Sequence, residues 1–262
     1  MSDSIAVFYC FPRSGGTLLN QCLLCAPGTV VLSEINPSSS VIPIEQQAAE
    51  WFQLLNPTEA ADLANRTYLE KISRVYDRTN AAQKSLCVRD WCGINFLAHI
   101  SPWLGVPSQV LEQRLYLQHG GYELREIALV RRSAAVYRSL HENIPELAAL
   151  TVEEFGAAYR SYLRQLSSVK KYQLEHLTSA SSAVLKSICA DLKMPFPSGF
   201  ETRFHTITTV TGNNTLPTPP ASARWTAIQG TSKTGNQQPS AEHLEIFEGL
   251  DQLAGYGPLT SQ

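Results

Sequence analysis

The sequence lacks any long hydrophobic run. No apolar segment approaches the roughly 20 residues that a membrane-spanning helix needs, although hydrophobic residues make up 44% of the 262-residue chain. The first residues, Met1-Ser2-Asp3-Ser4, also lack the charged and apolar regions of a signal peptide. We therefore expect no membrane span and a cytoplasmic location.

An excess of basic charge and a disulfide-type cysteine spacing are also missing. The 21 lysines and arginines are balanced by 23 aspartates and glutamates, which argues against a nucleic-acid binding protein. The six cysteines follow no disulfide framework, so we expect reduced core residues. Cys22 and Cys25 formally match Cys-x-x-Cys, but no second pair or histidine partner accompanies them, and the sequence favours no metal site.

The chain does have a regular alternation of apolar, strand-like segments and amphipathic, helix-like segments. This alternation predicts a three-layer α/β fold in which helices cover a central parallel sheet of about five strands. The predicted strands are 4–10, 29–32, 84–90, 124–130 and 169–174. The predicted helices are 17–25, 58–79, 109–119, 131–143, 151–167, 180–192 and 241–253. We expect residues 1–262 to form a single domain, with long loops at 205–240.

The most informative stretch is 8–19, where an apolar strand runs into a Gly-rich turn and then into the start of an apolar helix. Backbone N–H groups, a helix N-terminus, the cation of Arg13 and two hydroxyl groups would converge there on one anionic group. The pattern Gly-x-x-x-x-Gly-Lys-[Ser/Thr] is absent, and no magnesium ligands replace it. The stretch therefore predicts a phosphate site without nucleotide hydrolysis; an ordinary tight turn is the alternative interpretation.

Two motifs resemble those of sulfotransferases that use 3′-phosphoadenosine 5′-phosphosulfate (PAPS). Residues 12–17, Pro-Arg-Ser-Gly-Gly-Thr, resemble the loop that binds the 5′-phosphosulfate. A second apolar strand ends in Arg131, and Ser139 follows eight residues later on a predicted helix, as at the family's 3′-phosphate site. A helix rises about 1.5 Å per residue, so Ser139 can reach back to the strand end. Residues 172–196 resemble a later segment of bacterial members more loosely.

The second motif departs from the family pattern directly after Arg131. The usual Arg-Asp-Pro is Arg131-Arg132-Ser133 here, which keeps the phosphate-binding arginine but changes the turn. Arg132 is either a second phosphate ligand or a solvated side chain, and the surface preference of arginine favours the solvated interpretation.

The resemblance, to the bacterial and tyrosylprotein-type branch, implies a P-loop-like sulfotransferase fold, PAPS as donor, the bisphosphate PAP as product, and no metal. It implies that the cofactor is bound by Arg13, Ser14, Gly15, Gly16, Thr17, Leu18, Arg131 and Ser139. Arg13 would also hold the leaving bridge oxygen. A late basic loop closes over the 3′-phosphate in this family, and Lys233 is the best local match, with Arg224 as a competitor. The long loops at 205–240 would then cover the cofactor.

Glu34 is the candidate catalytic base, because related enzymes have their catalytic glutamate in a similar position after the second strand. A surface carboxylate is the alternative interpretation. His99 and His141 are rival bases, because the animal cytosolic branch uses a histidine. The candidate acceptor pocket, at the end of the third predicted strand, is Arg89, Asp90 and Trp91.

The predicted function is in-line transfer of a sulfuryl group from PAPS to a hydroxyl or amine of an unidentified small-molecule or peptide acceptor. One alternative is a family member that binds the nucleotide or a partner without turnover. A small-molecule kinase is less favoured, because the Walker lysine and a carboxylate pair for Mg²⁺ are missing.

Overall fold

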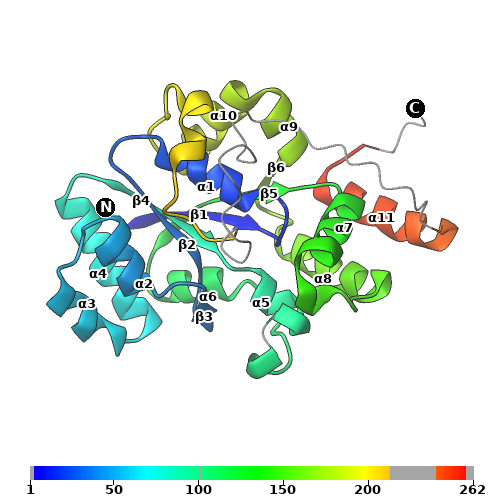
Figure 1. Cartoon of the computed structure of the whole chain (residues 1–262), viewed down its shortest axis with the longest axis horizontal. Coiled ribbons are helices and arrows are strands. Elements are labelled where there is room, and N and C mark those ends of the chain that lie inside the picture. Colours follow the sequence, from blue (N-terminus) through cyan, green and yellow to red (C-terminus); the bar gives the residue numbers. More distant parts are fainter. Residues whose placement is uncertain (1–2, 101, 213–239, 258–262) are drawn as a thin grey trace.

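The computed structural model describes residues 3–100, 102–212 and 240–257, and its centre is a twisted sheet (Figure 1). The sheet has six strands in the order β3-β2-β4-β1-β5-β6. They are β1 (Ser4–Cys10), β2 (Thr29–Asn36), β3 (Ser39–Ser40), β4 (Ser85–Asp90), β5 (Glu123–Val130) and β6 (Lys170–Gln173). All neighbouring pairs are parallel except β3, which pairs antiparallel with β2. The predicted parallel α/β sheet is confirmed, and the two-residue β3 is the strand that the sequence did not predict.

Side chains of alternate residues in the buried strands point to opposite faces of the sheet, where they form two apolar cores. Ala6, Phe8 and Cys10 of β1 pack with one group of helices, and Ile5, Val7 and Tyr9 pack with the other. The first group comprises α1 (Gly16–Leu24), α9 (Leu174–Ser179) and α10 (Ser181–Leu192). The second includes α3 (Pro57–Ala64), α4 (Tyr68–Ala81), α6 (Glu112–His119), α7 (Ser133–Asn143), α8 (Val152–Gln165) and α11 (Ala241–Ala254). Figure 1 shows the sheet between the two groups, which gives the three layers.

Short turns complete the chain. They are α2 (Ile44–Gln46), the π-helical turn η1 (Gln47–Trp51), α5 (Gly93–Phe96), η2 (Ala98–Ile100), η3 (Pro102–Leu104), η4 (Pro145–Leu147), η5 (Phe200–Thr202) and η6 (Phe204–Thr206). In the described part of the chain, no helix is both long and apolar enough to span a membrane. The six cysteines are free and buried, as expected.

The single helix predicted over 58–79 is wrong, because two helices occupy this stretch. Asn56 and Thr67 each cap a separate helix N-terminus, and each forms a capping box with the glutamate three residues later. The predicted capping box at Thr151 is confirmed.

The topology brings the two predicted phosphate motifs to one edge. β1 lies between β4 and β5, and both neighbours run parallel to it. The carboxyl ends of these strands therefore share an edge, where ligands of open α/β sheets bind. The loop after β1 and the turn after β5 are neighbours at this edge.

Candidate active site

The cradle loop, residues 11–18, joins β1 to α1. Arg13 and Gly15 have left-handed backbone, with φ of 69° and 92°. The N–H of Leu19 donates to the Gly15 carbonyl oxygen at 3.1 Å, so the preceding N–H groups of the first turn, at 16–18, have no acceptor within the helix. The N–H of Ser14, a residue predicted to bind the cofactor, does not join them, because it donates to the Phe11 carbonyl oxygen at 3.0 Å. The cradle thus presents the N–H groups of the first helical turn rather than that of Ser14.

The two hydroxyl groups of the cradle loop, on Ser14 and Thr17, have different surroundings. Ser14 Oγ is fully buried beside the hydroxyl group of Tyr159. Thr17 Oγ1 donates to the carbonyl oxygen of Thr211 at 3.0 Å. Because a hydroxyl has one proton to donate, the Thr17 hydroxyl is already used as a donor, and the Ser14 hydroxyl is enclosed beside Tyr159.

Gly16 allows a close approach that no other residue permits. A Cβ at this position would lie 2.2 Å from Cys10 Sγ and 2.8 Å from Arg89 Nε. The buried guanidinium of Arg89 therefore lies directly beneath the first turn of α1.

Arg13, Arg131 and Ser139 meet at the edge of the sheet. Arg131 Nη1 donates to the Arg13 carbonyl oxygen at 3.1 Å, across 118 residues of sequence. Arg13 Nε donates to Ser139 Oγ at 3.0 Å. The two sequence motifs thus form one cluster.

The two arginines make this cluster strongly positive. Burial lowers the pKa of Arg13, and the charge of Arg131 lowers it further. Burial also lowers the pKa of Arg131, although the Glu175 carboxylate opposes this shift. Among the residues described, neither Arg13 nor Arg131 forms an ion pair. Two half-buried cations without a paired carboxylate favour the binding of an anion.

Arg132 is not the solvated side chain that the sequence favoured. Its Nη1 lies 3.1 Å from Asp251 Oδ2, and its guanidinium lies 4.5 Å from the ring centroid of Tyr256. Asp251 Oδ1 also accepts a hydrogen bond from the Ser133 N–H at 2.7 Å. The carboxylate that binds the N-terminus of α7 therefore belongs to Asp251 of α11. It does not belong to a residue of the turn between β5 and α7.

Glu34 lies within β2, not after it, because the strand runs to Asn36 rather than ending at Leu32. Leu32 is opposite Val88 of β4, but Ile35 is opposite Asp90, so β2 contains one extra residue. This irregularity is a β-bulge. Glu34 occupies it with a left-handed φ of 49°.

The bulge directs Glu34 toward Arg89. Arg89 Nη2 lies 2.7 Å from Glu34 Oε1, and the two side chains are 6% and 13% exposed. Arg89 Nη1 also donates to Thr17 Oγ1 at 3.4 Å. Glu34 is thereby joined to the cradle loop through Arg89, and its charge opposes the lowering of the Arg13 pKa by burial and by Arg131.

The three residues of the candidate acceptor pocket do not share one pocket. Arg89 lies under α1, whereas Asp90 points to the opposite face, as successive strand residues do. Asp90 is buried and accepts a hydrogen bond from Asn36 Nδ2 at 3.0 Å. Burial raises the pKa of Asp90 to about 7. Trp91 is half-buried, and its N–H donates to the Ile35 carbonyl oxygen at 3.1 Å.

The other candidate residues lie apart or outside the described part. His99, in η2, faces Glu154 at the start of α8. His141 is exposed on α7, with its ring 6.0 Å from that of Tyr137. Lys233 and Arg224 lie outside the described residues. Within those residues, no group of histidine, cysteine and carboxylate side chains could hold a metal ion.

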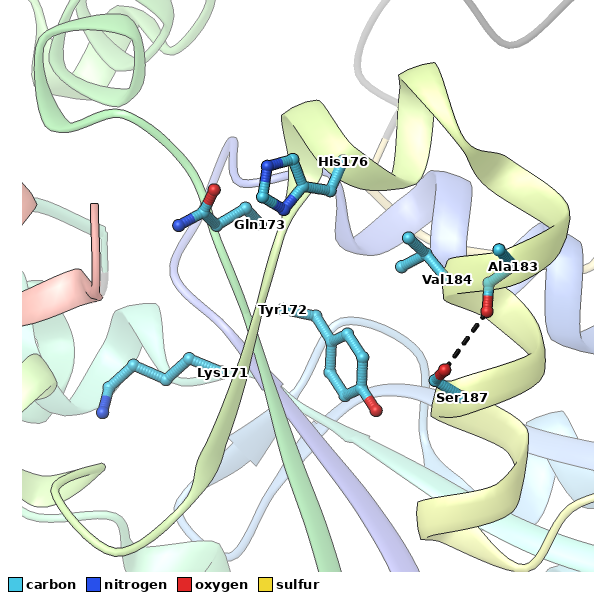
Figure 2. A pocket seen from close by; sticks show the side chains of 7 residues that line it. All are labelled: Lys171, Tyr172, Gln173, His176, Ala183, Val184 and Ser187. Carbon is cyan, nitrogen blue, oxygen red and sulfur yellow. Dashed lines mark hydrogen bonds between the residues drawn. The ribbon is translucent and has the colours of Figure 1, made fainter. Parts of the chain in front are cut away.

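A hollow of about 320 Å³ lies between β6, α9 and α10. It is lined by Lys171, Tyr172, Gln173, His176, Ala183, Val184 and Ser187. Figure 2 shows Tyr172 turned toward α10, with His176 at one end of the hollow. Leu174, which follows this strand, contacts the cradle: a Cβ on Gly15 would lie 2.5 Å from its Cδ1. A second hollow, of about 740 Å³, lies between α3, α4 and the residues before β5.

Solved structures identify the architecture. The sulfotransferase domain of the curacin biosynthetic pathway matches with a TM-score of 0.63 and 14% identity, over 98% of this chain and 99% of that one. The sulfotransferase domain of the Synechococcus PCC 7002 olefin synthase matches with a TM-score of 0.59 and 16% identity, over 95% of each chain. The chain has the sulfotransferase-domain fold. No family model matches the sequence, and no curated protein matches it significantly.

Two residues near the site of this sulfotransferase-type fold were missed by sequence reasoning. Gln47 is fully buried in η1 and bonds both backbone groups of Ser33. Thr211 is fully buried and contacts Thr17, Ser33 and Arg89. Neither residue lies in a recognisable motif. The sequence signal for Gln47 is weak: it is one of several polar residues interspersed among the apolar residues of 44–55.

Proposed function

We propose that this protein is a sulfotransferase that moves the sulfuryl group of PAPS to a hydroxyl or amine of a small-molecule or peptide acceptor. The observation that carries the proposal is the cluster of Arg13, Arg131 and Ser139. Its side chains come from the two motifs that resemble the 5′- and 3′-phosphate sites of PAPS-dependent enzymes. A bisphosphorylated adenosine has anions at both positions.

The residues present fit such a ligand. Three N–H groups at 16–18, which have no acceptor within α1, can donate to a 5′-phosphate. Arg131 and Ser139 can bind the 3′-phosphate, and Arg13 is the cation for the bridge oxygen that leaves with the product. The hollow between β6, α9 and α10 is our candidate for the adenosine, because Leu174, which follows β6, contacts Gly15 of the cradle.

The chemistry then requires positioning, charge stabilisation and a base. The bond between sulfur and the bridge oxygen breaks as a bond from sulfur to the acceptor oxygen or nitrogen forms. Glu34 takes the acceptor proton. Oε1 of Glu34 is held by Arg89, which leaves Oε2 as the basic atom.

Transfer from labelled donor tests this proposal. The protein is incubated with ³⁵S-labelled PAPS and a pool of phenols, alcohols and amines, and labelled products are separated by chromatography. We expect transfer by the unmodified protein and a loss of roughly 100-fold or more in Glu34→Gln, since a general base contributes about that much. Glu70→Gln, at the exposed capping box of α4, should retain full transfer. Absence of transfer by the unmodified protein, or full transfer by Glu34→Gln, contradicts the proposal.

A further inference from the structure

The backbone of Glu34 needs support from its surroundings. A φ of 49° is uncommon for a residue with a side chain, and such conformations persist where neighbouring groups fix them. Bulges often re-aim a side chain next to an active site. The question is which residue holds this bulge in place.

In the part of the chain that the structure describes, no strand lies beside Ser33 at the outer edge of β2. The antiparallel β3 pairs only with Ile35 and Asn36, so it ends before the bulge. The backbone N–H and C=O of Ser33 would therefore be left without ladder partners.

Gln47 takes the place of the missing strand. Its Oε1 accepts from the Ser33 N–H at 2.7 Å, and its Nε2 donates to the Ser33 carbonyl oxygen at 2.9 Å. The same Nε2 donates to the carbonyl oxygen of Ile42 at 2.8 Å. The side chain is fully buried. It sits in a π-helical turn, a geometry that is frequent at functional sites.

The remaining contacts hold the bulge from its other sides. The Thr211 N–H donates to Ser33 Oγ at 3.2 Å, and the Val41 N–H donates to the Glu34 carbonyl oxygen at 3.2 Å. The charged and titratable groups whose fields act on Glu34 are Arg89 from β4, Arg13 from the cradle loop and Cys10 at the end of β1. Gln47 contributes no charge, so its influence on Glu34 acts through the backbone.

We propose that Gln47 is a positioning residue for Glu34. By fixing Ser33, it sets the bulge that turns the carboxylate toward Arg89 and the cradle loop. This inference rests on the proposed function, in which Glu34 accepts the proton of the acceptor. Within the described residues, the side-chain hydrogen bonds of Gln47 go to Ser33 and Ile42, which are not assigned to donor binding.

The chain offers a matched control for the burial of a glutamine. Gln113 is also fully buried, but it lies on α6 and donates to the Tyr68 hydroxyl of α4, among residues that do not belong to the cradle. Gln47→Met and Gln113→Met each keep a side chain of similar length and remove the hydrogen bonds. A role in stability alone would leave the transfer rate of both folded variants unchanged.

The test is a double-mutant cycle between Gln47 and Glu34, read by single-turnover transfer from ³⁵S-labelled PAPS to the pooled phenols, alcohols and amines. We expect Gln47→Met to slow transfer about 100-fold, as misplacement of a reacting group by about 1 Å does. Its affinity for 3′,5′-bisphosphoadenosine, measured by calorimetry, should stay within about twofold of the unmodified protein. In a Glu34→Gln background, Gln47→Met should cause no further loss of transfer rate, because the base that Gln47 positions has already been removed. Gln113→Met should not slow transfer.

Three results overturn the inference while leaving the proposed function intact: an unchanged rate in Gln47→Met, a further loss of rate when it is added to Glu34→Gln, or an equal loss of bisphosphate affinity. Absence of transfer by the unmodified protein overturns the proposed function and the inference together. If Gln47→Met does not fold, Gln47→Glu replaces it in the cycle, because it keeps the acceptor for the Ser33 N–H and removes both donated bonds. The three results named above then overturn the inference for Gln47→Glu in the same way.

Discussion

Arg131 donates a hydrogen bond to the backbone carbonyl of Arg13, and the two residues are separated by 118 positions in the sequence. The bond joins the turn after β5 to the loop after β1. It holds the guanidinium of Arg131 beside a loop whose own guanidinium contacts Ser139. A single anionic ligand at this place would therefore contact both motifs, and four predictions concern the groups that build the site.

Gly16→Ala should disrupt the cradle. The added Cβ would lie 2.2 Å from Cys10 Sγ and 2.8 Å from Arg89 Nε, and both are buried groups with little room to move. We expect a loss of at least about 1 to 3 kcal/mol in the free energy of unfolding, as for overpacked cores, measured by urea denaturation. Gly249→Ala, in α11 where nothing lies within 4 Å of the new Cβ, is the control and should be neutral or stabilising. Equal stability of Gly16→Ala and the unmodified protein would contradict the packing described.

Arg89→Met should be strongly destabilising. It leaves the Glu34 carboxylate, 13% exposed in its ion pair, without its partner, and breaking a buried pair in this way costs about 3 to 5 kcal/mol. Adding Glu34→Gln should restore part of the loss, because the uncompensated charge is removed. Arg66→Met, which breaks an ion pair whose side chains are 51% and 70% exposed, should change the unfolding free energy by less than about 1 kcal/mol. Similar losses in the two single variants would argue against a buried pair.

Asp251→Asn should weaken the docking of α11 on α7. The aspartate accepts from the Ser133 N–H at 2.7 Å and pairs with Arg132 at 3.1 Å. Loss of a capping carboxylate with one ionic partner is expected to cost roughly 1 to 2 kcal/mol, measured by thermal and urea denaturation. Glu248→Gln, exposed on the same helix, should have no measurable effect. A neutral Asp251→Asn would show that α11 is held by its apolar face alone.

Asp90 should make stability depend on pH in an unusual direction. Burial raises its pKa to about 7 in the folded protein, above the unfolded value of about 3.9. Between these values the folded state binds more protons than the unfolded state, so the contribution of Asp90 to the unfolding free energy falls as pH rises through this window.

Asp90→Asn should abolish that contribution. From pH 5 to pH 8 the unmodified protein should lose about 2 kcal/mol relative to Asp90→Asn in urea denaturation. Asp62→Asn, on the exposed face of α3, should follow the unmodified protein at every pH. Parallel pH profiles for Asp90→Asn and the unmodified protein would contradict a raised pKa.

Much of the fold could be predicted from hydrophobic pattern because the parallel strands are buried on both faces. The prediction for β1 gave the same bounds as the structure, since six of its seven residues are buried and a Gly-rich turn follows. The division of 58–79 was missed although Thr67 and Glu70 form a capping box in the middle of the stretch. The apolar periodicity continues across that break and masked the signal.

The candidate site was predictable only where local sequence determines geometry. The cradle loop and the spacing of Arg131 and Ser139 are local features, and the structure brings them together. The bulge at Glu34 was not predictable, because residues 32–36 contain no glycine or proline that would mark an irregularity, and Pro37 follows only where the strand ends. Its supports, Gln47 and Thr211, act through tertiary contacts. Arg132 likewise finds its partner on α11, far along the chain.

The central claim is that the cradle loop and Arg131 bind one doubly phosphorylated adenosine. Calorimetric titration of 3′,5′-bisphosphoadenosine tests it in the unmodified protein, in Arg13→Ala and Arg131→Ala, and in the control Arg125→Ala, whose guanidinium instead bonds the Ser4 carbonyl oxygen at the start of β1. We predict one binding site, weakened by about 10- to 100-fold in Arg13→Ala and Arg131→Ala, as expected for lost hydrogen bonds to a charged group, and unchanged in Arg125→Ala. No binding, stronger binding of ATP with Mg²⁺, or equal affinity in all four proteins would contradict the claim.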